Sequence, residues 1–338
     1  FGKVVCYGQR ELLTLGPGDQ LRGDVYFSSA AQVDDTDITT FTSRGVFLLA
    51  YFREEMEAVP GEDSLRYLPQ LAGKALRERL TELYDGDTAA FLQALLTGDK
   101  SGLSDRVYGD LSGAGLLHIT AVSGLHCMFL LGLLQMLIGR HRRRLLAAVA
   151  VPVLIFYALL AGASPSAVRA CIMAIFLLAA PLLGRESDPP TALSAALAVI
   201  LLANPFAAAS VSLQLSFGAV AGLLWLSPRV YRGLAGEKPG RHRVRRFLAG
   251  SLSATAGALV FTIPLTAIYF NQLVLVSPLS NLLCLWAATT AFALGLVSVL
   301  LRMVWMPLGM LLAWPTDWVV RYLLAVARGL CALPYHAL

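Results

Sequence analysis

The chain has 338 residues, of which 57% are hydrophobic and 14% are charged, and its mean hydropathy is +0.65. This composition exceeds what a soluble core can bury, so it excludes an ordinary soluble domain and predicts several membrane spans. Residues 1–110 hold 11 Lys and Arg against 18 Asp and Glu, whereas the remainder holds 16 against 4. Two differently solvated parts are therefore expected.

Residues 1–30 contain three short β-rich runs, FGKVVCY, ELLTL and QLRGDVYF, with turn residues GPGD at 16–19. Such runs bounded by turn signals predict strands. Tyr7, Tyr26 and Phe27 could stack on the bases of a single nucleic acid strand. Ordinary packing between the strands explains the same aromatic residues at least as well. The run that follows them, Asp34, Asp35 and Asp37, is acidic and does not favour contact with a nucleic acid.

Residues 44–110 are charged and helical in period. The run GVFLLAYF at 45–52 is too short to span a membrane and is interpreted as a packed or interfacial segment. From Ser64 to Tyr84, leucines recur at helical spacing opposite basic residues, which predicts an amphipathic helix. Its basic residues are Arg66, Lys74, Arg77 and Arg79. A face toward solvent or lipid headgroups is favoured for them over DNA contact.

The stretch GAGLLHITAVSGLH at 113–126 opens the hydrophobic half and interrupts its first span. His118, Ser123 and His126 lie there among residues apolar enough for a bilayer. Polar or irregular backbone persists in a membrane only where protein or a water-filled cavity covers it. The stretch is therefore predicted to line a polar path.

Apolar runs after Gly113 predict an all-α polytopic membrane bundle with broken or half-spanning helices. The predicted spans are 116–138, 145–163, 167–183, 191–203, 206–226, 247–270 and 279–301, with weaker segments at 303–314 and 318–333. The run 191–203 is too short to cross ~30 Å, and Asn204 and Pro205 end it. Pro264 and the polar residues between Asn271 and Asn281 predict further breaks, which usually surround a site.

The short loops form two sets that alternate along the chain: 139–144, 184–190, 227–246 and Arg302 in one, and 164–166, 204–205 and 271–278 in the other. The first set carries 13 Lys or Arg and the second carries none. This asymmetry places the first set in the cytoplasm and the acidic N-terminal part outside it. The basic loops could also bind DNA phosphates or anionic lipid, but setting the topology is a sufficient role for them.

Polar groups inside the spans are the candidates for chemistry. Arg169 is the one charged residue within the apolar run 145–183. A buried guanidinium costs several kcal/mol unless partners or water meet it, so Arg169 is predicted to face a cavity and to contact phosphate. Its alternative is a structural bond to a carbonyl near the span end. Gln214 and Ser216 are predicted to form a polar stripe, which could equally make interhelical hydrogen bonds.

His118 and His126 do not indicate a metal site, because no carboxylate lies near them in the spans and the five cysteines form no CxxC pair. They are expected to position Ser123 and its loop, and no metal or cofactor is predicted. One alternative is an intramembrane hydrolase with Ser123 as nucleophile and His118 or His126 as base. The sequence AVSG, however, lacks the first glycine of a GxSG arrangement.

The segment GDKSGLSDRVYGDLSGAGLLHITAVSGLH resembles the signature of the ComEC-type competence proteins. Later segments resemble landmarks of the same family in the same order: PSAVRA at 165–170, LLANP at 201–205, SLQLSF at 212–217, FN at 270–271 and SPLSNLL at 277–283. The resemblance implies a channel for single-stranded DNA in the bacterial inner (cytoplasmic) membrane. The DNA path is then expected to include His118, Ser123, His126, Arg169, Gln214, Ser216, Asn271 and Asn281.

The resemblance also implies a domain order. Residues 1–42 are expected to be part of an extracytoplasmic OB-type barrel, 43–110 an amphipathic helical connector at the outer membrane face, and 111–338 the transmembrane domain. Implied partners are single-stranded DNA, membrane lipid, a DNA receptor outside, and a translocating motor or nuclease on the cytoplasmic side.

Enzymatic and coupled-transport roles find less support in the sequence. Neither a GxxxxGK[ST] loop nor an HxHxDH run occurs, so the chain is expected to conduct DNA without ATPase or nuclease chemistry. A small-solute transporter remains a further alternative. Its coupling carboxylate is missing, because acidic residues after 111 lie at loops or span ends.

Overall fold

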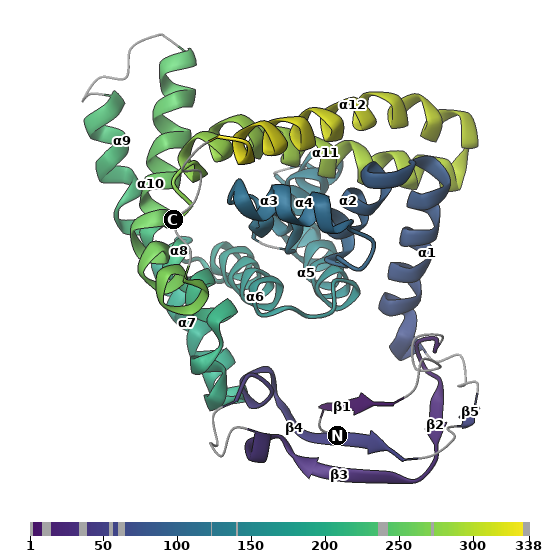
Figure 1. The fold of residues 1–338 in the computed structure, drawn as a ribbon. Helices are drawn as coiled ribbons and strands as arrows, with labels where there is room; N and C mark the ends of the chain where they lie inside the picture. Colours follow the sequence, from purple (N-terminus) through teal and green to yellow (C-terminus); the bar gives the residue numbers. More distant parts are fainter. Residues whose placement is uncertain are drawn as a thin grey trace.

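The computed structural model describes residues 3–8, 15–33, 39–53, 57–59, 65–122, 124–139, 141–235, 243–271 and 274–333. A small β region lies at one end of the molecule, and a bundle of helices forms the rest (Figure 1). A long hairpin of two helices crosses the bundle on the side away from the β region.

The β region contains two small sheets. β1 (Lys3–Tyr7) pairs in parallel with β4 (Val46–Phe52), and β3 (Val25–Ser29) pairs antiparallel with the other edge of β4. β2 (Gln20–Arg22) and β5 (Glu57–Val59) form a separate antiparallel ladder. The expected strands in FGKVVCY and QLRGDVYF are confirmed, whereas most of ELLTL lies outside the described residues. The OB-type assignment stays a prediction.

The predicted helical character from residue 44 onward is wrong at its beginning, because GVFLLAYF supplies the central strand β4. A short apolar run has no period that separates a buried strand from a buried helix. Gly45, at φ 76°, lets the chain turn out of the 3-10 helix Thr42–Arg44 directly into this strand. The expected packed segment is thus present, but as β structure.

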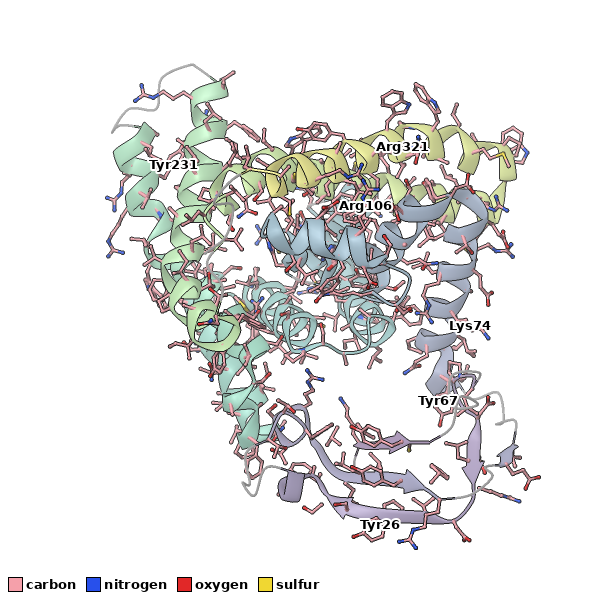
Figure 2. All side chains as sticks on the ribbon, viewed as in Figure 1. Tyr26, Tyr67, Lys74, Arg106, Tyr231 and Arg321 are labelled. Carbon is pink, nitrogen blue, oxygen red and sulfur yellow. The ribbon has the colours of Figure 1, made fainter. Side chains whose placement is uncertain are left out.

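The predicted amphipathic helix is confirmed as α1 (Leu68–Leu83), preceded by the 3-10 turn Leu65–Tyr67. Leu80 is fully buried against the bundle, whereas Lys74 is exposed on the outer side of the helix (Figure 2). α1 extends from the β region toward the turn of the long hairpin (Figure 1), where Glu82 pairs with Arg302 at 2.7 Å.

This pairing is at odds with the expected topology. Arg302 is counted among the cytoplasmic positions, and the connector containing Glu82 is expected at the outer face. α1 has 16 residues and therefore covers about 24 Å. The helix of the connector thus runs along the bundle, from the β region toward the turn of the long hairpin.

The next helix, α2 (Gly86–Thr97), lies in the centre of the bundle. Phe91, Leu92, Leu95 and Leu96 are all fully or almost fully buried. A helix that is apolar all round packs inside a protein, and here α2 shares one core with helices from the membrane part. The chain beyond residue 85 therefore already belongs to the bundle, although the sequence assigns it to the connector.

The remaining helices follow in order: α3 (Asp105–Gly113), α4 (Gly124–Ile138), α5 (Arg143–Leu160), α6 (Pro165–Ala179), α7 (Pro189–Ala203), α8 (Val211–Trp225), α9 (Ser227–Ala235), α10 (Arg243–Phe270), α11 (Ser277–Val304) and α12 (Met306–Cys331). Short 3-10 helices follow α6 at Ala180–Leu183 and α7 at Pro205–Ala209. In the described residues, five helices are long and apolar enough to cross a membrane, or six if α8 and α9 count as one bent span. The predicted polytopic helical fold is confirmed.

Three predicted breaks differ in the structure. Residues expected as a loop at 227–246 include α9, which is bent 42° from α8. Pro264 lies inside the continuous helix α10 and does not end it. The two weak segments at 303–314 and 318–333 form one helix, α12, although Pro315 lies inside it. There the Thr316 hydroxyl donates to the Leu312 carbonyl, as hydroxyls commonly do beside prolines in membrane helices.

Glycines set the crossing of α8 and α10. A Cβ added to Gly222 would lie 2.0 Å from the carbonyl oxygen of Gly257, and one added to Gly257 would lie 2.8 Å from that of Gly222. The two backbones therefore touch without a side chain between them. Such close approach is typical of helix pairs in membranes.

The break after α7 contacts the β region. The Asn204 side-chain amide donates to the Thr42 carbonyl at 3.0 Å, and the rings of Phe206 and Phe47 meet edge to face at 5.9 Å. The predicted short helix ending at Asn204 is confirmed. Its end is a contact point between the bundle and the sheet.

Candidate functional site: a buried arginine beside a broken helix

Irregular backbone separates α3 from α4, as the sequence predicts. Residues 114–116 form a turn, Leu117–Thr120 form a 3-10 helix, and α4 begins only at Gly124. Gly115 has φ 71°, and a Cβ there would lie 2.3 Å from Ser277 Oγ, so only glycine fits. The break is covered by the first turn of α11, where Ser280 Oγ donates to the Ala114 carbonyl at 2.7 Å.

His118 and His126 lie in different surroundings. His118 is exposed, and its Nδ1 lies 2.9 Å from the Gly115 carbonyl oxygen, which accepts a hydrogen bond when Nδ1 carries the proton. His126 is only 2% exposed, and its ring centre lies 4.7 Å from that of Phe292 in the core. Ser123 lies outside the described residues. Of the two histidines, only His118 is therefore open to a ligand in this conformation.

Arg169 is held in the first turns of α6, which begins with Ser164 as cap and Pro165 in the first turn. Its side chain is buried, at 5% exposure for the residue. Nε donates to Ser216 Oγ of α8 at 2.7 Å, and Nη1 lies 3.4 Å from the sulfur of Met173. The guanidinium also lies over the ring of Phe217, 5.7 Å from its centre.

The buried charge of Arg169 has no carboxylate partner among the described residues, since none of the five ion pairs there includes it. The groups that contact the cation are a hydroxyl, a thioether and an aromatic ring, and none of them carries a charge. Gly124 lies beside it, because a Cβ on that glycine would approach Nη2 to 3.9 Å. The arginine and the start of α4 therefore adjoin.

Gln214 and Ser216 do not form one stripe. Ser216 faces Arg169 of α6, whereas the Gln214 side chain turns to α10, where Tyr269 Oη donates to its Oε1 at 2.9 Å. Residues two apart on a helix lie about 200° from each other, so this divergence follows from the helical period. The alternative prediction, that both side chains make interhelical hydrogen bonds, is confirmed.

Asn271 lies at the start of the break between α10 and α11, whereas Asn281 lies beyond it, inside α11. Asn271 is exposed and ends α10 at φ 50°. Asn281 is buried in the second turn of α11, and its Oδ1 accepts no hydrogen bond from the described residues. The structure thus brings Arg169 and Ser216 together, whereas His118, His126 and Gln214 contact other groups.

Two site neighbours, Phe217 and Tyr269, escape the sequence reasoning. Phe217 is adjacent to Ser216 in SLQLSF, so a polar residue within a span is a local signal near it, but Arg169 lies 48 residues earlier in the sequence. Tyr269 has no such signal, because its contact with Gln214 depends on how α8 and α10 cross. No group of three or more His, Cys, Asp and Glu side chains in the described part of the chain is placed to hold a metal.

Exposed tyrosines on the small sheet form a second candidate surface. Tyr7, Tyr51 and Tyr26 occupy paired positions on β1, β4 and β3, and the rings of Tyr7 and Tyr51 stack at 5.1 Å. Arg53 lies over the Tyr26 ring at 5.4 Å. Figure 2 shows Tyr26 on the side of the sheet remote from the helices. Phe27 points to the other face of β3, because successive strand residues alternate.

The family model for "Competence protein" matches residues 95–338. The chain is 29% identical over 202 residues to ComE operon protein 3 of Bacillus subtilis (strain 168), a match that covers 58% of this chain and 24% of the relative. It is 33% identical over 227 residues to competence protein ComA of Neisseria gonorrhoeae, covering 62% of this chain and 31% of the relative. The chain thus spans about a quarter to a third of these relatives' length. No solved structure matches it.

Proposed function

Because the chain belongs to the competence protein family, we propose that it conducts single-stranded DNA across the bacterial cytoplasmic membrane. The observation that carries this proposal is the buried, carboxylate-free Arg169 beside the broken start of α4. The planar guanidinium fork matches phosphate oxygens, and a passing phosphate would supply the missing counter-charge.

Other observations support the two sides of the path. Asn204 links a predicted outer loop to the β region, which supports placing both on the outer face. Two predicted cytoplasmic loops, 139–144 and 184–190, lie close together, as loops on one face of the membrane should. In the proposal, the tyrosine row of the sheet meets DNA delivered by an outer receptor, and a motor or nuclease acts at the cytoplasmic side.

The alternative functions gain no comparable support. An intramembrane hydrolase using His126 as base needs that ring open to substrate and water, but the ring is 2% exposed and packs against Phe292 in the core. A coupled solute transporter needs a carboxylate inside the spans. The expectation that Asp317 lies at a span end is wrong, because Asp317 lies near the middle of α12. Its carboxylate is already engaged, since it pairs with Arg321 and accepts a hydrogen bond from Thr88.

Substitution of Arg169 tests the proposal. Arg169→Ala removes one charged hydrogen bond, worth about 1.5–3 kcal/mol, and a cation–π contact, worth about 0.5–2 kcal/mol. Relief of guanidinium desolvation offsets this loss by several kcal/mol. We therefore expect near-normal protein level and melting temperature, with uptake of labelled DNA abolished in cells carrying the variant. Arg169→Lys should restore part of the uptake, because the charge remains without the fork.

The exposed Arg246→Ala provides a matched control for loss of a positive charge away from the site, and its uptake should stay normal. Undiminished uptake in Arg169→Ala would remove Arg169 from the DNA path. A large fall in melting temperature together with uptake would assign the residue to helix packing instead.

A further inference from the structure

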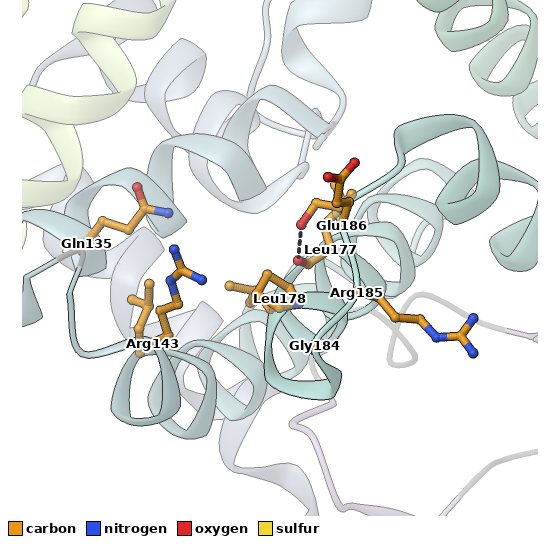
Figure 3. A pocket seen from close by; sticks show the side chains of 10 residues that line it. Gln135, Arg143, Leu177, Leu178, Gly184, Arg185 and Glu186 are labelled. Carbon is orange, nitrogen blue, oxygen red and sulfur yellow. Dashed lines mark hydrogen bonds between the residues drawn. The ribbon is translucent and has the colours of Figure 1, made fainter.

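A cavity of about 680 Å³ opens where the end of α4, the start of α5 and the segment after α6 meet (Figure 3). Gln135 and Arg143 lie on its polar side, and Leu177, Leu178 and Pro181 form much of its apolar side. Figure 3 shows the Arg143 guanidinium extending toward Gln135, whereas Arg185 points away. The cavity is separate from the Arg169 site, with which it shares no lining residue.

The charge around this cavity is positive. The segments around it carry four arginines, Arg142, Arg143, Arg144 and Arg185, against two carboxylates, Glu186 and Asp188. None of the four arginines forms an ion pair with a described residue. One of the carboxylates, Asp188, is occupied as the cap of α7, where it accepts from the Thr191 amide and hydroxyl. A second hollow of about 510 Å³ adjoins, and Arg143 lines both. Arg143 is thus the cation best placed for an anionic ligand.

The cavity lies at the ends of two candidate membrane spans, Arg143–Leu160 and Pro165–Leu183. Apolar side chains nearby are highly exposed: Met136 at 79%, Leu137 at 70% and Leu183 at 75%. Such exposure fits a hydrocarbon environment, whereas the arginines fit the headgroup layer. The cavity therefore has a basic wall and an apolar wall at the level where a bilayer changes from headgroups to hydrocarbon.

We infer that this cavity binds the phosphodiester headgroup of an acidic phospholipid. Arg143 contacts the phosphate, Gln135 donates a second hydrogen bond, and the leucine wall receives the first part of an acyl chain. A nucleic acid phosphate could also contact the arginine, but a nucleic acid has no acyl chain to pack against the apolar wall. A lipid is therefore the better match. The site is independent of the proposed DNA path.

Lipid binding to the purified full chain in detergent, measured by native mass spectrometry, tests the inference. Phosphatidylglycerol should bind at least about fivefold more tightly than phosphatidylcholine with the same acyl chains. Arg143→Gln should weaken phosphatidylglycerol binding about fivefold, the effect of one basic residue at a membrane surface. Glu186→Gln, which removes an exposed negative charge from the cavity wall, should strengthen it. The exposed Arg246→Gln, a loss of charge elsewhere, should leave it unchanged.

Equal affinity for the two lipids would overturn the inference, as would unchanged phosphatidylglycerol binding in Arg143→Gln. If that variant fails to fold, Glu186→Gln decides alone, and unchanged affinity in it refutes the site. Competition separates the possible sources of phosphate. Displacement of phosphatidylglycerol by millimolar inorganic phosphate, or by a short oligodeoxythymidylate, would identify a free-phosphate or DNA site and refute the lipid assignment.

Discussion

Replacing Gly222 by alanine tests whether direct backbone contact fixes the crossing of α8 and α10. The new Cβ would lie 2.0 Å from the Gly257 carbonyl oxygen, and real Cβ contacts essentially never fall below 3.0 Å, so the helices must shift by about 1 Å. Overpacking of this kind costs about 1–3 kcal/mol. Alanine itself is better than glycine in a helix by about 1 kcal/mol. The net expectation is a loss of up to about 2 kcal/mol.

Gly250→Ala is the matched control, because it lies in α10 with nothing within 4 Å of its added Cβ. It has the same gain in helix propensity without the clash. Thermal unfolding of the full chain in detergent should place Gly222→Ala roughly 2–12 °C below Gly250→Ala, at roughly 2–4 °C per kcal/mol. A Gly222→Ala melting temperature equal to or above that of Gly250→Ala would show that the two helices do not cross this closely.

Three further predictions concern the β region, α1 and the topology. The pKa of Glu82 is lowered by its hydrogen bond from Arg79 and by Arg302. The stability that the ionised Glu82 contributes is therefore fully present above the ordinary glutamate pKa of about 4.3. It is lost as the pH falls through the lower pKa of the folded state. The melting temperature of Glu82→Gln should therefore fall below wild type at pH 7 and converge with it in acid; a constant gap would contradict this. Asn204→Ala should cost about 1 kcal/mol and speed proteolysis of the β region, and unchanged cleavage rates would argue against its carbonyl contacts. In a cysteine-free background, a cysteine at the exposed Thr40 should react with an impermeant reagent in intact cells, and one at Ser187 only after lysis, and the reverse pattern would invert the orientation.

The sequence predicts those features that depend on composition or on a local departure from it. The polar break before α4 is visible because His118 and the glycines stand in an apolar run, and the buried Arg169 is visible for the same reason. Both follow from the cost of polar groups in hydrocarbon. An interhelical hydrogen bond of Ser216 is also predicted, because hydroxyls within a span usually bond to a neighbouring helix, although the sequence does not identify Arg169 as its partner.

Features that depend on tertiary packing are harder to predict. β4 is apolar without a clear period, and α2 is apolar all round, so neither local pattern reveals that one lies in a sheet and the other in the centre. His126 faces Phe292 because of how α4 meets α11, and helical spacing alone does not distinguish that side from the path. Pro315 likewise predicts a break, yet α12 continues, because packing against α11 outweighs a local helix breaker.

The glycine contact between α8 and α10 also determines which motions the bundle allows. With no side chain between Gly222 and Gly257, a change in the crossing angle of the two helices would turn about this contact and would move the neighbouring side chains of Phe261 and Ser227. Ser216 lies six residues from this pivot, about 9 Å along α8. Rotation about the pivot therefore moves Ser216 sideways relative to Arg169. A swing of α8 would lengthen their hydrogen bond, while the contact of the guanidinium with Met173, which lies on the same helix as Arg169, would stay in place.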